Sequence, residues 1–139
     1  MLAAMNLGAD AVQIGSRFVA SIESSAHQNF KNVVVSAKEG DTQLTMKEIT
    51  PVRLIKNEFY QQLAKAYENG ASVEEIKELL GRGRAKKGMF EGDLLEGELE
   101  IGQVSGLIHD IIPASEIVNE IVKDFRTAIE AQKSEKFQF

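Results

Sequence analysis

The chain has 139 residues, and 43% of them are hydrophobic, enough for one domain with a sizeable core. It contains no cysteine, which excludes a disulfide scaffold, a thiol nucleophile and a cysteine-ligated zinc site. The formal net charge of -5 argues against a nucleic-acid partner, and no apolar run reaches the roughly 18 residues of a membrane span. Residues 1–10 lack the basic segment of a secretory signal, so we expect a cytoplasmic protein with no membrane partner.

The first forty residues predict a helix end, a strand and a second helix. Residues 1–7 are apolar and alanine-rich and are followed by Gly8, a residue that often closes a helix. The short run 11–14 (AVQI) stops at Gly15 and predicts a buried strand of the kind that parallel sheets contain. We expect the second helix over about residues 24–37.

The middle of the chain predicts two further helices. Residues 43–49 fit either a strand or a loop. Pro51 is expected to start a helix that continues up to Gly70, because proline suits the first helical turn. Ser72 and Glu75 have the spacing of a capping box and predict the start of the next helix.

The last part of the chain predicts loops and a long terminal helix. Glycines are frequent over residues 81–106, where we expect loops with a short helix near 84–90. Ser115 is expected to begin the last helix, which carries one apolar face. The chain is thus predicted to be mostly α-helical with one strand, at 11–14. A single parallel strand cannot satisfy its own backbone hydrogen bonds, which suggests that the chain is part of something larger.

The segment after the predicted strand has the features of an anion site. A strand, a Gly-Ser pair and a helix bring the backbone amides of Gly15, Ser16 and Arg17 toward one point, where the Ser16 hydroxyl adds a donor. Phosphate commonly binds to the loops after strands 7 and 8 of (β/α)8 barrels in this way. The alternative is a strand that simply ends in a tight turn.

Four stretches, in order, resemble the nitronate monooxygenase family, formerly called 2-nitropropane dioxygenase, which includes FMN-dependent enoyl-ACP reductase II enzymes. Residues 8–18 (GADAVQIGSRF) resemble the eighth barrel strand of that family. Residues 53–59 (RLIKNEF) look like its arginine-and-asparagine helix, and 87–93 (KGMFEGD) look like its glycine-rich turn. Residues 102–108 (GQVSGLI), followed by 113–118 (PASEIV), look like its closing segment and last helix.

The resemblance implies an α/β fold, namely the C-terminal part of a (β/α)8 TIM barrel with a helical insertion on the substrate side. A complete barrel takes about 250 residues, so strands 1 to 7 would lie outside this chain. Residues 1–40 would form the last barrel strand and helix, 41–112 the helical and glycine-rich substrate-side segment, and 113–139 the C-terminal helix and tail. Neither His27 nor His109 matches the position of the family's catalytic histidine, so we assign no catalytic residue and no metal ligand.

The resemblance also implies which residues face the cofactor. Those expected at the FMN phosphate are Gln13, Gly15 and Ser16. Those expected on the flavin and substrate side are Gln103, Ser105 and Gly106. Gln103 and Ser105 have an ordinary helix cap as their alternative role, and the two histidines are expected to be surface or structural residues.

Two charged segments are expected to be solvated rather than functional. Residues 82–87 carry a basic cluster, which could instead meet an anionic carrier protein or a nucleotide phosphate. Residues 91–100 carry an acidic run that lacks the spacing of a calcium loop and is expected at the surface.

Three hypotheses for the function follow. The first is the C-terminal portion of an FMN-dependent oxidoreductase, inactive alone, whose full form would use NADH or NADPH and act on an alkyl nitronate or an enoyl thioester. The second is a non-catalytic helical fragment or partner subunit that self-associates or pairs with a missing barrel half, because its apolar faces would be bare. The third, nucleic-acid binding through residues 82–87, has the least support because the cluster lacks aromatic residues.

Overall fold

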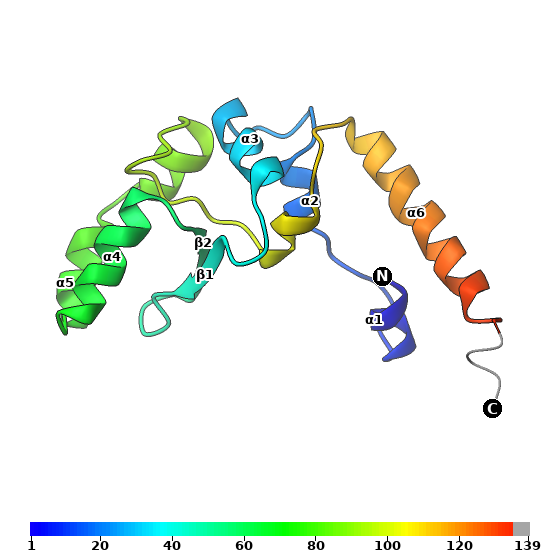
Figure 1. Ribbon diagram of the computed structural model, residues 1–139, viewed down its shortest axis with the longest axis horizontal. Helices are drawn as coiled ribbons and strands as arrows, with labels where there is room; N and C mark the ends of the chain where they lie inside the picture. Colours follow the sequence, from blue (N-terminus) through cyan, green and yellow to red (C-terminus); the bar gives the residue numbers. More distant parts are fainter. Residues whose placement is uncertain (135–139) are drawn as a thin grey trace.

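The computed structural model describes residues 1–134 and shows an elongated arch (Figure 1). Helices α1 (Leu2–Asn6) and α6 (Ala114–Ala131) lie at one end of the arch, and α4 (Glu58–Glu68) and α5 (Val73–Leu80) lie at the other. Between them lie α2 (Ser16–Val19), α3 (Gln28–Ser36), strands β1 (Thr42–Thr45) and β2 (Val52–Ile55), the π-helical turn η1 (Lys86–Phe90) and the 3-10 helix η2 (Gln103–Leu107).

The strands form an antiparallel hairpin that a third segment extends. β1 pairs with β2 so that Thr42 lies opposite Ile55 and Leu44 lies opposite Arg53. On the other side of β2, the Ile55 amide donates to the Leu99 carbonyl at 3.0 Å, and the Ile101 amide donates to the Arg53 carbonyl at 3.0 Å. Residues 99–101 therefore pair with the edge of β2 that faces away from β1. They also bring η2, which follows them in the chain, next to the hairpin.

The strand prediction for residues 11–14 is wrong in this structure. The segment has no strand pairing, and residues 11–15 form an irregular connection between α1 and α2. A strand requires a neighbour to receive its backbone hydrogen bonds, and within residues 1–134 nothing lies beside this segment in that role. The prediction of a mostly helical chain is confirmed, but its strands are β1 and β2 rather than 11–14.

The prediction of a helix that starts at Pro51 is also wrong. Residues 52–55 form β2, in which Leu54 and Ile55 are buried in the core, and α4 begins only after Asn57. The apolar residues that suggested helical spacing therefore belong partly to a strand and partly to a helix. Tertiary packing against residues 99–101 decides between the two, and this is not visible in the local sequence.

Other expected elements are confirmed. α1 ends next to Gly8, the Ser72–Glu75 capping box starts α5, a short helical segment covers residues 84–90, and the last helix begins at Ala114. The helix expected over 24–37 is shorter at its start, because the His27 side chain accepts a hydrogen bond from the Asn29 amide and caps α3.

Two apolar clusters hold the arch together. One joins α3, β2 and residues 99–108 through Phe30, Val34, Leu99 and Ile108. The other joins the hairpin to α4 and α5 and includes Met46, Leu54, Phe59, Leu63 and Ile76. The two clusters meet at β2, since Leu54 belongs to one and Ile55 to the other, so β2 fixes both halves around the cavities described below.

The basic and acidic segments are largely structural. Arg84 donates to the carbonyls of Leu79, Leu80 and Glu96, and its guanidinium lies 4.4 Å from the centre of the Phe59 ring. Lys86 pairs with Glu91 and Lys87 pairs with Asp93, at 3.1 and 3.0 Å. The expectation that residues 91–100 lie wholly at the surface is wrong for Glu98, which is only 6% exposed.

Candidate functional site: two cavities beside Arg53

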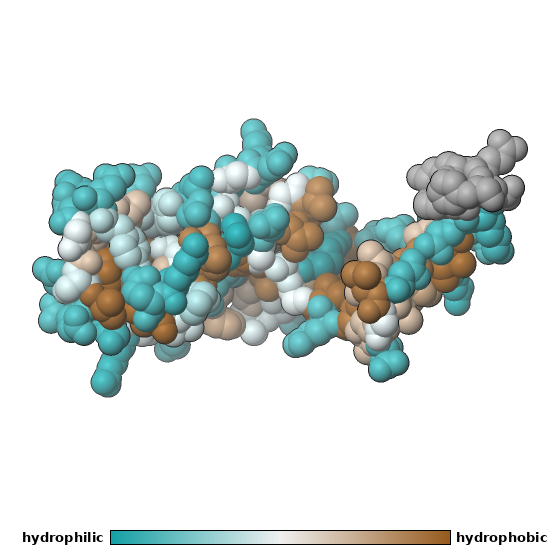
Figure 2. Space-filling model, turned by 90° about the horizontal axis from the view of Figure 1, so that it is seen from below, coloured by the Kyte–Doolittle hydropathy of each residue, from teal (hydrophilic) through white to brown (hydrophobic). Residues whose placement is uncertain are grey.

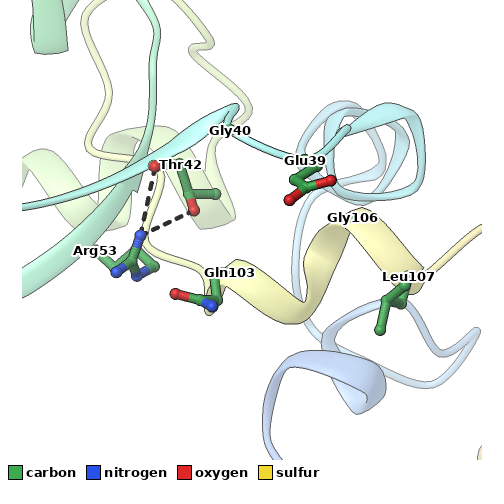
Figure 3. Close-up of a pocket in the computed structure, with 7 residues that line it drawn as sticks. All are labelled: Glu39, Gly40, Thr42, Arg53, Gln103, Gly106 and Leu107. Carbon is green, nitrogen blue, oxygen red and sulfur yellow. Dashed lines mark hydrogen bonds between the residues drawn. The ribbon is translucent and has the colours of Figure 1, made fainter.

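Two cavities flank Arg53 in the centre of the arch. The first, here called the η2 cavity, has a volume of about 530 Å³ and is lined by Glu39, Gly40, Thr42, Arg53, Gln103, Gly106 and Leu107 (Figure 3). The second, here called the α2 cavity, has a volume of about 460 Å³ and is lined mainly by residues at the start of α2, in β2 and over 100–102. Arg53 lines both cavities, so the two cavities lie on either side of this residue.

A hydrogen bond joins the two sequence segments that were expected at the cofactor. The Gly102 amide donates to Ser16 Oγ at 3.1 Å, across 86 positions of the sequence. A Cβ atom on residue 102 would lie 2.7 Å from the same Oγ, which is closer than such atoms approach. Glycine at 102 therefore lets the backbone pass directly against Ser16.

The start of α2 leaves hydrogen-bond donors open. Within residues 1–134 the amides of Gly15, Ser16 and Arg17 make no hydrogen bond, as is usual for the first turn of a helix. The Ser16 hydroxyl accepts from Gly102 and retains its own proton for a further acceptor. Gly15 and Ser16 both line the α2 cavity, so two of these three residues lie at a space that a ligand can enter.

Arg17 fixes the position of α2. Its Nη1 donates to the Asp110 carbonyl at 3.1 Å and its Nη2 to Asp110 Oδ1 at 2.5 Å. Glu120 on α6 lies 3.8 Å from the same Nη2. The Arg17 side chain is thereby committed to the structure, and only its backbone remains available to a ligand.

The η2 cavity is narrow where η2 approaches the loop after α3. A Cβ atom on residue 106 would lie 3.2 Å from the Glu39 nitrogen and 3.3 Å from the Lys38 carbonyl carbon. Gly106 therefore sets the distance between η2 and this loop. Gln103, on the first turn of η2, is exposed and its side chain extends toward Arg53 in Figure 3.

The structure groups the expected site residues into the two cavities. Gly15 and Ser16 line the α2 cavity, and Gln103 and Gly106 line the η2 cavity. Gln13 is exposed and lines neither cavity. Ser105 is fully buried between α2, α3 and η2, and its hydroxyl has no hydrogen-bond partner among the described residues. The roles expected for all of these residues stay predictions.

Sequence reasoning missed Arg53 and Thr42 as site residues. Arg53 Nη1 donates to Thr42 Oγ1 at 3.2 Å and to the Thr42 carbonyl at 3.4 Å. The only sequence signal was the position of Arg53 in a family-like stretch. That stretch was expected to be helical, whereas Arg53 lies on β2, where it pairs with β1 and borders both cavities.

One carboxyl near the α2 cavity is strongly perturbed. Burial raises the pKa of Glu98 to about 7, and the neighbouring Glu100 adds to the rise while Arg84 opposes it. Glu98 itself lines neither cavity, whereas Glu100 lines the α2 cavity. Neither histidine lines a cavity either: His27 caps α3 and His109 is exposed.

The described part of the chain has neither a metal cluster nor a membrane helix. No three histidine or carboxylate side chains of residues 1–134 gather as metal ligands would. Within the same residues no helix has the length and apolar character needed to cross a membrane.

A comparison with known protein families decides the membership of the chain. The family model for nitronate monooxygenase matches residues 1–124. The chain belongs to the nitronate monooxygenase family. The resemblance that the sequence stretches suggested is thereby confirmed, and the family is one of flavin-dependent oxidoreductases in general.

Individual relatives agree with this membership. The chain is 32% identical over 125 residues to a probable nitronate monooxygenase of Staphylococcus saprophyticus. The matched region covers 88% of this chain and 34% of that relative. It is also 51% identical over 43 residues to a probable nitronate monooxygenase of Bacillus subtilis. This shorter match covers 31% of this chain and 12% of that relative. The chain therefore spans about a third of the length of the first of these relatives.

Solved structures are similar over nearly the whole chain. FabK from Thermotoga maritima superposes with a TM-score of 0.85 at 36% identity, covering 96% of this chain and 42% of that one. A point mutant of the same FabK gives a TM-score of 0.77 at 35% identity, with 96% and 40% covered. This member of the nitronate monooxygenase family thus has the fold of less than half of FabK, which belongs to a TIM-barrel family, and residues 1–134 by themselves form helices and a hairpin rather than a barrel.

Proposed function

We propose that this chain is the C-terminal portion of an FMN-dependent oxidoreductase of the nitronate monooxygenase or enoyl-ACP reductase II type, and that it holds the phosphate end of the flavin. The hydrogen bond between Gly102 and Ser16 is the observation that carries the proposal. It joins the Gly-Ser pair, expected at the phosphate, to the start of the segment expected on the flavin side. The whole enzyme's activity would need the remaining two thirds of the fold, so the chain alone is proposed to be inactive.

The α2 cavity suits a phosphate group. The open amides of Gly15, Ser16 and Arg17 supply donors, and the Ser16 hydroxyl supplies another. Arg53 and Glu100 also line this cavity, so one basic and one acidic residue border it beside the amides and the hydroxyl. Backbone amides, a hydroxyl and a guanidinium together are a donor set that forms its strongest hydrogen bonds with an anion.

The chain's own residues bind and orient, while the cofactor supplies the redox chemistry. Bound FMN would accept a hydride from NADH or NADPH, or electrons from the substrate. Ser16 would hold the phosphate and, through Gly102, fix the start of η2 at a set distance from it. Gln103 and Gly106 would then present the η2 surface toward the substrate side.

A titration of the purified chain into FMN tests the proposal. We expect saturable quenching of flavin fluorescence by the full chain, at least tenfold weaker binding of riboflavin, which lacks the phosphate, and a similar loss for Ser16→Ala. Ser25→Ala, which changes an exposed serine outside both cavities, is the matched control and should bind FMN as the unchanged chain does. Equal binding of FMN and riboflavin, or an unaffected Ser16→Ala variant, would contradict the phosphate site.

Two substrate classes are proposed for the whole enzyme. The curated relatives are named as probable nitronate monooxygenases, whereas the similar solved structures are of FabK. An alkyl nitronate, oxidised with dioxygen, and an enoyl thioester, reduced with a nicotinamide donor, are therefore both proposed. Activity assays with each substrate, on this chain combined with the N-terminal part of a family member, would separate them.

A second candidate function rests on exposed apolar side chains. Leu7 is 90% exposed and Leu107 is 77% exposed, and Val118 and Val122 lie on one exposed face of α6. In Figure 2 apolar surface is visible at the end of the molecule formed by α1 and α6, as well as along the rest of the same face. Such a surface favours a non-catalytic partner subunit or a self-associating fragment, and sedimentation of the isolated chain distinguishes this from a monomer.

A further inference from the structure

A buried lysine holds the turn that follows α2. Lys31, on α3, is only 4% exposed. Its Nζ donates to the Ser21 carbonyl at 2.7 Å and to the Ile22 carbonyl at 3.2 Å. The Ser21 amide in turn donates to the Phe18 carbonyl of α2 at 3.1 Å. Lys31 therefore fixes the end of the same short helix whose first turn borders the α2 cavity.

The positive charge of Lys31 has no counter-ion among residues 1–134. Lys31 makes no ion pair there, and both of its acceptors are neutral carbonyls. The carboxylate that follows these carbonyls in the sequence, that of Glu23, accepts from the Ala114 amide at 2.8 Å instead. Burying an ammonium group without a carboxylate is costly. A neutral donor could satisfy the two carbonyls at a smaller desolvation cost, so the charge itself needs an explanation.

This charge lies close to the α2 cavity. Val19 lines the cavity, and Ser21, whose carbonyl accepts from Lys31, follows two residues later. Consecutive Cα atoms are 3.8 Å apart, so the Cα atoms of these two residues lie within about 8 Å of each other. Arg53 and Glu100 also line the cavity, and their charges oppose each other. Lys31 therefore adds positive charge beside a cavity whose own ionic side chains are balanced, and salt screens a buried charge only weakly.

We propose that Lys31 is a positioning residue for the binding of a phosphate group in the α2 cavity: it holds the end of α2 with its hydrogen bonds and strengthens binding at the start of α2 with its charge. Lys31 itself lines neither cavity, so it acts without touching the ligand. The inference rests on the proposed function for the place of the anion, and it deepens that function by assigning a role to a residue outside the cavity.

The charge of the ligand separates an electrostatic role from a purely structural one. A phosphate monoester carries about one negative charge at pH 5 and about two at pH 7.5, because its second pKa is about 6. FMN and inorganic phosphate are titrated into the full ¹⁵N-labelled chain at both pH values while the Ser16 amide resonance is followed. About 0.5 M NaCl screens the exposed charges.

Lys31→Met keeps the apolar part of the side chain and removes the charge. We expect it to bind FMN about 2- to 4-fold more weakly than the unchanged chain at pH 5, and about 4- to 16-fold more weakly at pH 7.5, because doubling the charge of the ligand squares the factor. Inorganic phosphate should show the same trend. A loss of structure alone would weaken binding by the same factor at both pH values.

Two further variants and one direct measurement complete the test. Lys31→Gln keeps an N–H donor, so it should unfold at a higher temperature than Lys31→Met yet show the same charge-dependent loss. Lys38→Met, at an exposed lysine after α3 that lines neither cavity, is the matched control and should bind within about twofold of the unchanged chain. In the unchanged chain, phosphate should shift the ¹³Cε resonance of Lys31 more at pH 7.5 than at pH 5.

The results distinguish this inference from the proposed function. Equal factors at the two pH values for both neutral variants, or a Lys31 ¹³Cε resonance that phosphate leaves unmoved where neither variant folds, would overturn the inference and leave the flavin proposal intact. If inorganic phosphate shows the charge-dependent loss and FMN does not bind, the inference stands without the flavin proposal. A Ser16 amide that neither ligand shifts would overturn both.

Discussion

Ser16 and Gly102 form the contact at residue scale on which the site depends. The hydroxyl of one residue accepts the amide proton of the other at 3.1 Å, and no side chain fits between them. Their 86-residue separation explains why sequence spacing alone suggested each segment independently but could not place them together.

Gly102→Ala should break this contact. The new Cβ would approach Ser16 Oγ to 2.7 Å, so one of the two segments must shift. We expect a loss of about 1–2 kcal/mol in the free energy of unfolding by urea and weaker FMN binding. In a Ser16→Gly background the clash is gone, so the same alanine should cost clearly less. Equal costs in the two backgrounds would show that the clash with Ser16 Oγ is not the reason for the glycine.

Glu98 gives the protein a pH dependence with a defined sign. Its pKa is raised by burial from 4.5 to about 7, so the folded state holds a proton that the unfolded state has lost over this range. Stability contributed by Glu98 is therefore full below pH 4.5 and is lost as the pH rises toward and through 7.

Glu98→Gln should remove that dependence. After allowance for screening by solvent, we expect the variant to gain about 1–2 kcal/mol relative to the unchanged chain on going from pH 5 to pH 8. Urea unfolding at the two pH values measures the difference. Glu68→Gln, at an exposed position on α4, should show almost no such change. A Glu98 variant that behaves like this control would mean that the carboxyl is not desolvated.

At the scale of elements, the start of α4 depends on Asn57. Its Oδ1 accepts from the Tyr60 amide at 3.0 Å, and its Nδ2 donates to the carbonyls of Leu94 and Gly97 at 2.9 and 2.8 Å. One side chain thus caps a helix and holds the loop that leads to residues 99–101, the segment that pairs with β2.

Asn57→Ala should destabilise the chain by about 2–4 kcal/mol, because it removes the cap and leaves two carbonyls without their donor. Asn57→Ser keeps a capping hydroxyl and loses only the donors, so it should fall between the alanine variant and the unchanged chain. Thermal unfolding followed by circular dichroism measures both. Equal melting temperatures for serine and alanine would assign the whole effect to the loop contacts.

The elements that sequence predicted well are those with local signals. The capping box of Ser72 and Glu75, the glycine after α1 and the apolar face of α6 depend on neighbours within a turn. Residues 11–14 and 52–55 failed because strand formation depends on partners far away in the sequence. β2 gained two such partners, β1 and residues 99–101, whereas 11–14 has none within the described structure.

Some residues of the candidate site could be predicted from the sequence, and others depend on contacts between distant segments. Gly15, Ser16, Gln103 and Gly106 were identified through the family resemblance and lie in the two cavities. Arg53 was not identified, because its role depends on a hairpin that the sequence did not predict, and on a cavity that η2 completes from 50 residues further along the chain.

At the scale of the whole molecule, the α1–α6 end exposes apolar surface. α1 contacts α6, and Val118 and Val122 face outward at 48% and 37% exposure. We expect the isolated chain to self-associate, with a sedimentation coefficient that rises with concentration. Changing both valines to lysine should shift the chain toward a monomer, while lysines at the exposed polar positions Asn119 and Thr127 should not. A monomer at all concentrations would contradict the self-association.

Arg17 links the start of α2 to the distal helix α6. Its backbone lies in the first turn of α2, next to Gly15 and Ser16, which line the α2 cavity, while its guanidinium holds Asp110 and approaches Glu120 on α6. An anion that orders the start of α2 must therefore also restrict α6, because the same residue belongs to both. Coupling between two sites is reciprocal, so a contact that restricts the motion of α6 should also raise the affinity of the α2 cavity for an anion. Slower amide hydrogen exchange along α6 would then report that the α2 cavity is occupied, although α6 does not line this cavity.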